Sequence, residues 1–374
     1  MKIIILGPAW PYRGGIAAFG ERLAHEYQAQ GHDVELVTFT LQYPSFLFPG
    51  KTQYSTDPAP ADLTIHRMLS SVNPLSWLRT GRYIKKQRPD LVISAFWLPF
   101  MAPSMGTVLR MCRRKGTRRI GLLHNLIPHE HRPGDKLFGN YFVHSCDAFV
   151  TLSRSVLEDI DHFDPQRKRP RVYSPHPLYD HYGATLSRNE ALQLLGLPED
   201  RRYVLFFGFI REYKGLDLLL DAMADKRLEQ LGARLIVAGE FYGDPKPYME
   251  QIERLELGDR VVLKSDFIPD SEVNRYFCAA DIVAQPYRSA TQSGVTAIAL
   301  HFETPVVATP VGGLAECVER PGIGVMAQDI TAQSVADAVA RLYDEDPETF
   351  AARIREVKKE MTWKAFAGAI LGQL

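Results

Sequence analysis

The stretch FFGFIREYKGLDLLLDA, residues 206–222, decides the fold of the second half of the chain. It begins as an apolar run, passes through Gly208 and a short polar loop, and continues after Gly215 as a leucine-rich segment. An apolar run that ends in glycine is typical of a strand buried on both faces. We therefore expect a strand, a tight loop at its carboxyl end and then a helix.

The same alternation of apolar runs and helical segments extends in both directions along the chain. The other runs that predict strands are KIIILG (2–7), DVELVTF (33–39), LVISAF (91–96), RIGLLH (119–124), AFVTLS (148–153), ARLIVAG (233–239), RVVLKS (260–265), DIVAQPY (281–287) and TPVVATPV (304–311). Strands separated by helices imply mostly parallel, doubly wound sheets. The sequence therefore predicts an α/β protein with two Rossmann-like domains that face each other across a cleft.

One segment interrupts this alternation and divides the chain. Residues 163–178 are rich in proline and basic residues, and we interpret them as a linker. The first domain is expected to span residues 1–178 and the second residues 179–359. The helical end of the chain, residues 360–374 around Trp363, is expected to pack back on the first domain.

Composition narrows the class of protein. The 374 residues include 44 basic and 44 acidic side chains, and a net charge of zero does not support a nucleic-acid partner. The cysteines are far apart and have no metal-like spacing, and no metal is predicted: Cys112, Cys146, Cys278 and Cys317. No apolar stretch approaches the roughly 20 residues of a membrane span, and the start reads as a strand rather than a signal peptide. We expect a cytoplasmic protein whose membrane contact, if any, is peripheral.

The first of three candidate phosphate loops contains Gly14 and Gly15, between a strand and a helix. Paired glycines allow close approach of a ligand, and a helix N-terminus favours anions. An ordinary structural turn explains the pair equally well. The loop does not match G-x-G-x-x-G, which disfavours a dehydrogenase.

The second and third loops carry the stronger signals. Gly208 is followed by two cations, Arg211 and Lys214, just before a predicted helix, an arrangement that suits a diphosphate. In the third loop, hydroxyl-bearing residues lead into an apolar helix: Ser289, Thr291 and Ser293, followed by Gly294. The alternatives are solvated surface cations for the second loop and simple N-capping for the third.

Together these segments resemble the retaining glycosyltransferases of family 4, which have the two-domain B-type glycosyltransferase fold. The resemblance covers nearly the whole chain, through 206–222, VAGEFYGD (237–244), the run 286–316 that ends at Glu316, and SPHPLYD (174–180). It implies that residues of three kinds bind the donor. Arg211 and Lys214 would bind the diphosphate and act in catalysis together with His124, and Gly14, Gly15 and Gly208 would also bind the donor. Further phosphate contacts would come from Ser293, Gly294 and Val295, and nucleoside contacts from Glu240, Phe267 and Ile268. His124, at a strand end, would lie near the transferred sugar, although a lone histidine there is commonly packing.

The chain departs from the family pattern at several positions. The two glutamates that the family carries eight residues apart correspond to Ala290 and Ile298, which cannot accept hydrogen bonds through their side chains. Glu303 stands where the family has glycine before a strand, and Phe209 where it has arginine. We interpret the chain as a subtype that lacks the glutamate pair, with Arg211 as the substitute cation.

The resemblance implies a hexosyltransferase that needs no cofactor besides its nucleoside-diphosphate sugar donor and acts on a glycan or lipid-linked acceptor. Two basic segments, 77–90 and 108–119, carry apolar residues between their cations and suit an anionic membrane surface, although solvated helix faces would look the same: Trp77, Tyr83, Val108 and Met111. Two alternatives stay open. One is a sugar-nucleotide epimerase that uses His124, His129 and Glu130, and the other is a non-catalytic sugar-nucleotide-binding partner protein.

Overall fold

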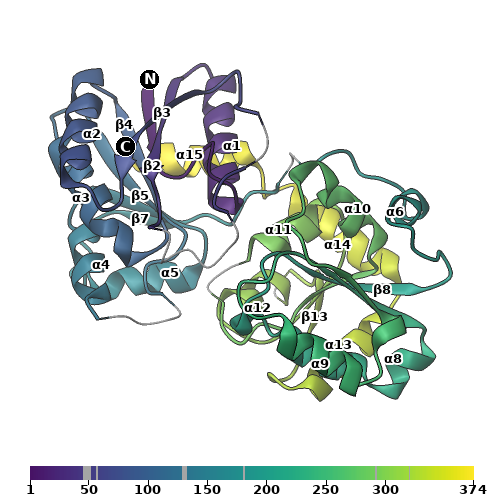
Figure 1. Cartoon of the computed structure of the whole chain (residues 1–374). Coiled ribbons are helices and arrows are strands. Elements are labelled where there is room, and N and C mark those ends of the chain that lie inside the picture. Colours follow the sequence, from purple (N-terminus) through teal and green to yellow (C-terminus); the bar gives the residue numbers. More distant parts are fainter. Residues whose placement is uncertain (45–51, 56–57, 129–132, 180–181, 291–292, 320) are drawn as a thin grey trace. The chain divides into compact units, whose positions relative to one another are not determined.

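A computed structural model describes residues 1–44, 52–55, 58–128, 133–179, 182–290, 293–319 and 321–374 (Figure 1). The chain forms two compact units. Unit 1 comprises Met1–His176 and Trp363–Leu374, and unit 2 comprises Pro177–Thr362. The boundaries expected from the sequence, after residues 178 and 359, lie a few residues from these.

Unit 1 contains a seven-stranded parallel sheet with the order β3-β2-β1-β4-β5-β6-β7. Its strands are β1 (Lys2–Leu6), β2 (Asp33–Leu41), β3 (Thr64–Ser70), β4 (Leu91–Phe96), β5 (Arg118–Leu123), β6 (Ala148–Thr151) and β7 (Arg171–Tyr173). The sequence did not predict the two edge strands. β3 is half exposed and mixes polar with apolar residues, so it lacks a continuous apolar run. β7 has only three residues and lies inside the predicted linker, which is therefore partly sheet.

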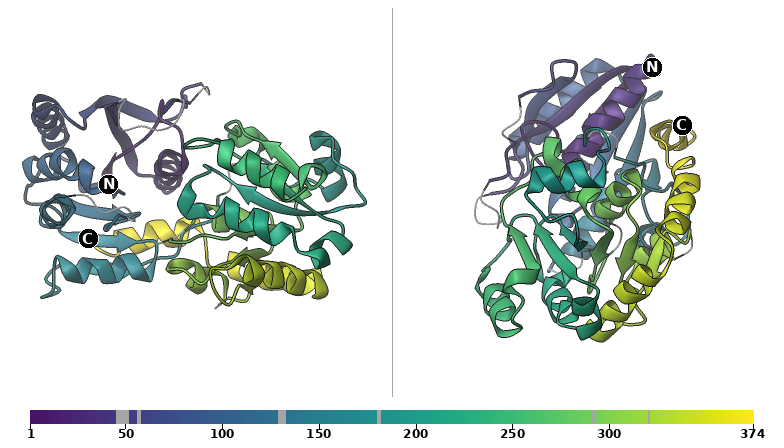
Figure 2. Two further views of the ribbon diagram at one scale, coloured as in Figure 1. Left: turned by 60° about the horizontal axis from the view of Figure 1, so that its bottom comes forward. Right: turned by 90° about the vertical axis from the view of Figure 1, so that its right-hand side faces the viewer.

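Helices cover both faces of this sheet (Figure 2). They are α1 (Gly15–Ala29), α2 (Pro74–Gln87), α3 (Ala102–Met111), α4 (Asp135–Val143), α5 (Arg154–Asp159) and α15 (Trp363–Leu371). Alternate residues of β1 separate the two cores: Ile3 and Ile5 share a cluster with the α1 side, and Ile4 and Leu6 one with α3 and α4. The last helix, α15, lies against α1 (Figure 1), where the Trp363 ring packs 4.9 Å from that of Phe19.

Unit 2 contains a six-stranded parallel sheet with the order β10-β9-β8-β11-β12-β13. Its strands are β8 (Arg202–Phe207), β9 (Ala233–Ala238), β10 (Val261–Lys264), β11 (Ile282–Gln285), β12 (Val306–Ala308) and β13 (Gly324–Met326). Its helices are α6 (Arg188–Leu195), α7 (Leu216–Met223), α8 (Lys226–Gln230), α9 (Lys246–Arg254), α10 (Val273–Ala279), α11 (Gly294–His301), α12 (Gly313–Val318), α13 (Ala332–Asp344) and α14 (Pro347–Lys358). The sequence did not predict α9, which has no buried residue, or the short edge strand β13.

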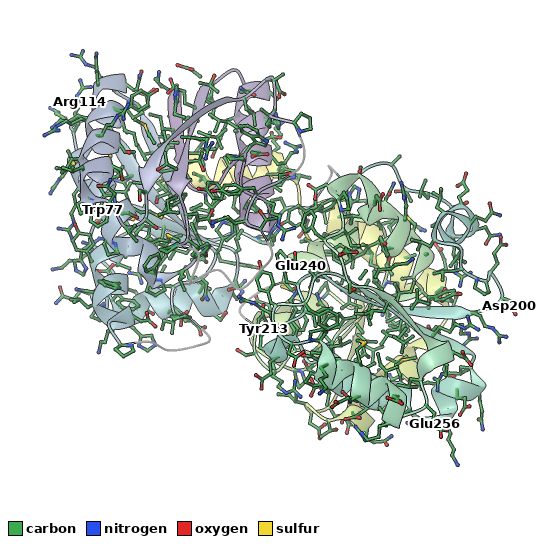
Figure 3. The ribbon with its side chains drawn as sticks, in the orientation of Figure 1. Trp77, Arg114, Asp200, Tyr213, Glu240 and Glu256 are labelled. Atoms are coloured by element: carbon green, nitrogen blue, oxygen red, sulfur yellow. The ribbon has the colours of Figure 1, made fainter. Side chains whose placement is uncertain are left out.

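The strand order of unit 2 indicates where this unit would bind a ligand. β8 lies between β9 and β11, so the chain leaves β8 toward one side of the sheet and reaches β11 on the other. In open α/β sheets, ligands bind at the carboxyl ends of the strands where the order reverses in this way. Figure 3 shows Tyr213 and Glu240 at that end of the sheet, with Asp200 and Glu256, which precede strands, at the opposite end. The loops after β8 and β11 are therefore the first place to look for a site.

In the described part of the chain, no helix has both the length and the apolar character needed to cross a bilayer.

Candidate functional site

The loop after β8 brings a lysine back over the end of the strand. Gly208 has a φ of +91°, which favours glycine, and a Cβ placed on it would lie 3.1 Å from Lys214 Nζ and 4.0 Å from Val295 Cγ2. Lys214 ends a short 3-10 turn, Glu212–Lys214, that precedes α7. The structure thus brings together Gly208, Lys214 and Val295, three residues that the sequence assigned to the donor site.

The charge on Lys214 is held in an unfavourable environment. Its side chain is partly buried, and Nζ lies 5.7 Å from the centre of the Tyr287 ring. Desolvation, with a further contribution from the nearby Arg211 cation, lowers the pKa of Lys214 from 10.5 to about 8. No carboxylate among the described residues acts on this pKa. A bound anion would relieve both the desolvation and the repulsion between the two cations.

Arg211, in the same loop after β8, approaches the neighbouring loop that follows β9. It is exposed, and its guanidinium lies 4.9 Å from the centre of the Tyr242 ring, which in turn stacks on Phe209 at 4.4 Å. Backbone hydrogen bonds join the two loops, from Ile210 N to Glu240 O at 2.8 Å and from Tyr242 N to Ile210 O at 2.9 Å. The Phe209 side chain thus stacks on Tyr242, and Arg211 supplies a cation two residues further on.

The loops after β8 and β11 are tied to each other. Arg288, after β11, donates from Nη1 and Nη2 to the Asp217 carboxylate at 2.8 and 2.5 Å, and from Nη1 to Glu212 O at 3.0 Å. Burial works to raise the pKa of Asp217, but Arg288 holds that pKa below its usual range. Gly215 has a φ of +68°, and a Cβ there would overlap with the carbonyl oxygen of Pro286. This close backbone contact fixes the spacing of the two loops.

The N-terminus of α11 completes the arrangement. Ser293 holds the N-cap position, but its hydroxyl does not cap the helix and instead accepts a hydrogen bond from Gln285 Nε2 at 2.9 Å. The N-capping explanation is therefore wrong for the Ser293 side chain. A Cβ on Gly294 would lie 3.2 Å from the hydroxyl of Tyr179, which belongs to the SPHPLYD segment. The first N–H groups of such a helix, which lack intrahelical acceptors, can bind phosphate oxygens.

The residues predicted to contact the nucleoside lie at the same carboxyl end of the strands. Glu240 follows β9 and is 2% exposed, and Figure 3 shows it at the carboxyl end of the strands. Phe267 and Ile268 follow β10, the neighbour of β9, and Ile268 is buried. Strand β9 lies between β10, which these two residues follow, and β8, which Lys214 follows.

The positions of the missing glutamates are apolar. Ala290 and Ile298 are both buried in one apolar cluster of unit 2. Glu303 adopts a φ of +61°, a backbone conformation that favours the glycine which the family has there. Its carboxylate pairs with Arg355 at 2.9 Å and Lys358 at 3.0 Å. Glu303 is therefore engaged on α14 rather than at the phosphate loops.

Unit 1 contains the remaining predicted residues. Gly14, with a φ of +107°, precedes α1, and Gly15 is the first residue of that helix. His124 follows β5 and is 8% exposed, with its ring packed edge-on against Phe19 at 5.2 Å. Desolvation, with a smaller contribution from His176, lowers the pKa of His124 from 6.5 to about 3. His124 is therefore neutral near pH 7 and can hydrogen-bond a sugar but cannot supply a positive charge. Thr291, His129 and Glu130 lie outside the described residues.

The low pKa of His124 predicts a dependence of stability on pH. Between pH 6.5 and about pH 3, His124 is protonated in the unfolded chain but neutral in the folded chain. Because the unfolded state binds the extra proton, the free energy of unfolding decreases as the pH falls through this range. The contribution is at most about 1.4 kcal/mol per pH unit. Urea unfolding of His124→Gln should show a shallower loss between pH 6.5 and 4.5 than the wild type. An identical pH slope would contradict the assignment, and the exposed His144→Gln serves as the control.

Sequence reasoning missed Gln285, Arg288 and Tyr179. Gln285 is fully buried at the last position of β11, and it donates to Ser293 and accepts from Thr296. A polar residue at the end of the otherwise apolar run DIVAQPY was the signal that could have identified it. Arg288 and Tyr179 lie in segments that carry the family resemblance, but neither was singled out, because the residues that they contact are distant in sequence.

Comparison with known proteins gives matches in both units. A family described as Glycosyltransferase Family 4 matches residues 13–176, and one described as Glycosyl transferases group 1 matches residues 201–345. A D-inositol 3-phosphate glycosyltransferase of Corynebacterium aurimucosum is 32% identical over 213 residues, which are 55% of this chain and 50% of that protein. The chain thus spans about half the length of this relative. An uncharacterized glycosyltransferase of Methanocaldococcus jannaschii is 25% identical over 358 residues, covering 91% of this chain and 89% of that protein.

Solved structures show the same fold at low identity. Sucrose-phosphate synthase from Thermosynechococcus elongatus superposes with a TM-score of 0.75 at 18% identity, covering 100% of this chain and 98% of that one. Anabaena HepE in complex with UDP gives a TM-score of 0.75 at 18% identity, with both chains covered completely. WaaG, a glycosyltransferase involved in lipopolysaccharide biosynthesis, gives 0.72 at 16% identity, also with full coverage of both. These neighbours have the two-domain glycosyltransferase fold expected from the sequence.

Proposed function

Since the chain belongs to the family 4 glycosyltransferases, we propose that it transfers a hexose from a nucleoside-diphosphate sugar to a glycan or lipid-linked acceptor. The observation that carries this proposal is Lys214, an ammonium of lowered pKa beside a second cation, Arg211. Both cations lie at the carboxyl end of the unit 2 strands, where α11 begins. Val295, in the first turn of α11, lies near Gly208. Such a constellation suits the diphosphate of a sugar nucleotide.

In the reaction, the bond between the sugar's anomeric carbon and the distal phosphate oxygen breaks, and the acceptor oxygen bonds to that carbon. We propose retention of configuration, with the departing phosphate accepting the proton of the acceptor hydroxyl. Lys214, Arg211 and the N-terminus of α11 would stabilise the negative charge that develops on the leaving diphosphate. No carboxylate nucleophile is needed, which agrees with the apolar residues Ala290 and Ile298.

The proposed role is the synthesis of cell-surface polysaccharide or glycolipid by a cytoplasmic enzyme. Thermal-shift screening of UDP, GDP and ADP comes first, followed by turnover of the corresponding sugar nucleotides. UDP-glucose is the first sugar nucleotide to test, because HepE was solved in complex with it. Inositol 3-phosphate is tested as an acceptor beside lipid-linked glycans, because the corynebacterial relatives are named D-inositol 3-phosphate glycosyltransferases. Acceptor-dependent release of the nucleoside diphosphate supports the proposal. Interconversion of the donor sugar would instead indicate an epimerase, and nucleotide binding without turnover a partner protein.

Helix α2 gives a physical basis for peripheral contact with an anionic membrane. Its exposed side chains include the apolar Leu75, which is 75% exposed, and Leu78. The same helix exposes four cations and contains no acidic residue: Arg79, Arg82, Lys85 and Lys86. Apolar residues followed by cations on one helix suit the boundary of anionic lipid. The aromatic residues expected to take part pack inward instead, since Trp77 donates to Ser70 O at 2.6 Å and Tyr83 to Glu35 at 2.7 Å.

Charge reversal of α2 should therefore weaken vesicle binding. We expect Arg79→Glu/Arg82→Glu to lose at least about tenfold in affinity for phosphatidylcholine vesicles that contain phosphatidylglycerol, because each cation contributes roughly 1 kcal/mol. Co-sedimentation at low and high salt measures this loss. Lys226→Glu/Lys246→Glu makes the same charge change on exposed residues of unit 2 and should bind as the wild type does. Equal losses in the two double variants would contradict a specific role for α2.

A further inference from the structure

A buried amide links the last residue of β11 to the first turn of α11. The side chain of Gln285 is completely buried. Its Nε2 donates to Ser293 Oγ at 2.9 Å, and its Oε1 accepts from Thr296 Oγ1 at 2.8 Å. One side chain of the sheet therefore holds both the N-cap residue of α11 and a residue one turn further on.

The amide decides what the Ser293 hydroxyl can do. A serine hydroxyl has one proton to donate and can accept two hydrogen bonds. An N-cap serine ordinarily accepts from a backbone N–H of the first turn. Here the hydroxyl accepts from Gln285 instead, and Thr296 N donates to the backbone oxygen of Ser293 at 3.1 Å. The hydroxyl proton is thereby directed away from Gln285, since an amide N–H cannot accept it.

We propose that Gln285 is a positioning residue that orients the Ser293 hydroxyl as a hydrogen-bond donor to the distal phosphate of the sugar nucleotide's diphosphate. This inference rests on the proposed function and extends it, because it assigns a role to a residue that does not touch the donor. The hydroxyl belongs to the same small group as Lys214. Tyr287 OH lies 3.4 Å from Ser293 Oγ, and the Tyr287 ring centre lies 5.7 Å from Lys214 Nζ.

The surroundings favour a hydroxyl over a carboxylate at this place. The positions of the family's two glutamates, Ala290 and Ile298, present only apolar side chains. Burial raises the pKa of Tyr287, so its phenol stays protonated and neutral. Among the described residues, Ser293 Oγ makes polar contacts with the neutral groups of Gln285, which donates, and Tyr287, whose hydroxyl can be donor or acceptor. A network of neutral groups does not repel a phosphate electrostatically.

The test compares diphosphate with monophosphate binding. The probe is whichever of UDP, GDP or ADP stabilises the wild-type chain most, with its monophosphate as the reference, and dissociation constants come from titration calorimetry. Gln285→Glu keeps the shape but offers only acceptors, so it should draw the Ser293 proton toward itself. We expect this variant and Ser293→Ala to bind the diphosphate about tenfold or more weakly. Their monophosphate affinity should change less than twofold.

A double-mutant cycle separates positioning from a purely structural role. If Gln285 acts through Ser293, then Gln285→Glu/Ser293→Ala should bind the diphosphate no more weakly than Ser293→Ala alone. Gln285→Met, which removes the amide without adding a charge, gives a second cycle if the glutamate destabilises the fold, and melting temperatures monitor folding.

Additive losses, or equal losses for mono- and diphosphate, would overturn the inference while leaving the proposed function intact. Wild-type protein that binds none of the three nucleotides would overturn both.

Discussion

Replacement of Lys214 by methionine is expected to lower kcat/KM for the sugar nucleotide by about 10²–10³-fold. Methionine keeps most of the length of the side chain and its packing near the Tyr287 ring but removes the charge. The loss should appear in kcat, because the ammonium stabilises charge that grows on the leaving diphosphate. Thermal stabilisation by the nucleoside diphosphate should also largely disappear.

The free variant should fold at least as well as the wild type. The lowered pKa of Lys214 means that burial and the Arg211 charge destabilise its charged form, and methionine carries no charge to destabilise. Lys226→Met, on the exposed surface of the same unit, is the matched control and should leave turnover unchanged. A Lys214→Met enzyme with wild-type turnover would remove the main support for the donor site.

Substitution of Gly215 by alanine should disrupt the same site through the backbone. The residue has a φ of +68°, which costs an alanine roughly 1–2 kcal/mol, and the added Cβ would overlap with the carbonyl oxygen of Pro286. Because the contact is with backbone, the loops after β8 and β11 must move apart. We expect a loss of about 3 kcal/mol or more in the free energy of unfolding, and loss of nucleotide binding.

Gly232→Ala isolates the effect of the overlap. Gly232 has nearly the same backbone conformation, a φ of +67°, but its Cβ would meet Arg201 Nη1 at 3.7 Å, an ordinary contact. Urea unfolding of this variant should show only the conformational cost, with nucleotide binding intact. If the two alanine variants are equally stable, the contact between Gly215 and Pro286 does not set the spacing of the loops.

The sequence predicted those parts of the fold that bury continuous apolar runs. β1, β4, β8 and β9 bury side chains on both faces of a sheet, so most of their residues are apolar. β3 was not predicted because it mixes polar with apolar residues, and β7 and β13 were not predicted because each has only three residues. Helix α9 was not predicted because it has no buried residue.

For the site, residues within one loop were easier to predict than contacts between loops. The sequence indicated Lys214 and Arg211 because they share a strand–loop–helix unit with Gly208 and Gly215. The contacts of Arg288 with Asp217 and of Gln285 with Ser293 depend on which strands are neighbours, and that order is set by the sheet. The local pattern also favoured N-capping by Ser293, and a tertiary hydrogen bond overrides it.

Hydrogen exchange measured by mass spectrometry, with and without the nucleoside diphosphate that stabilises the chain most, tests the location of the donor site directly. The account predicts that the nucleotide slows amide exchange in the loop after β8, residues 208–215, and in the first turn of α11, residues 293–296. In Lys214→Met this protection should be lost at the same nucleotide concentration. Protection confined to Met1–His176, with no change in these two segments, would contradict the account.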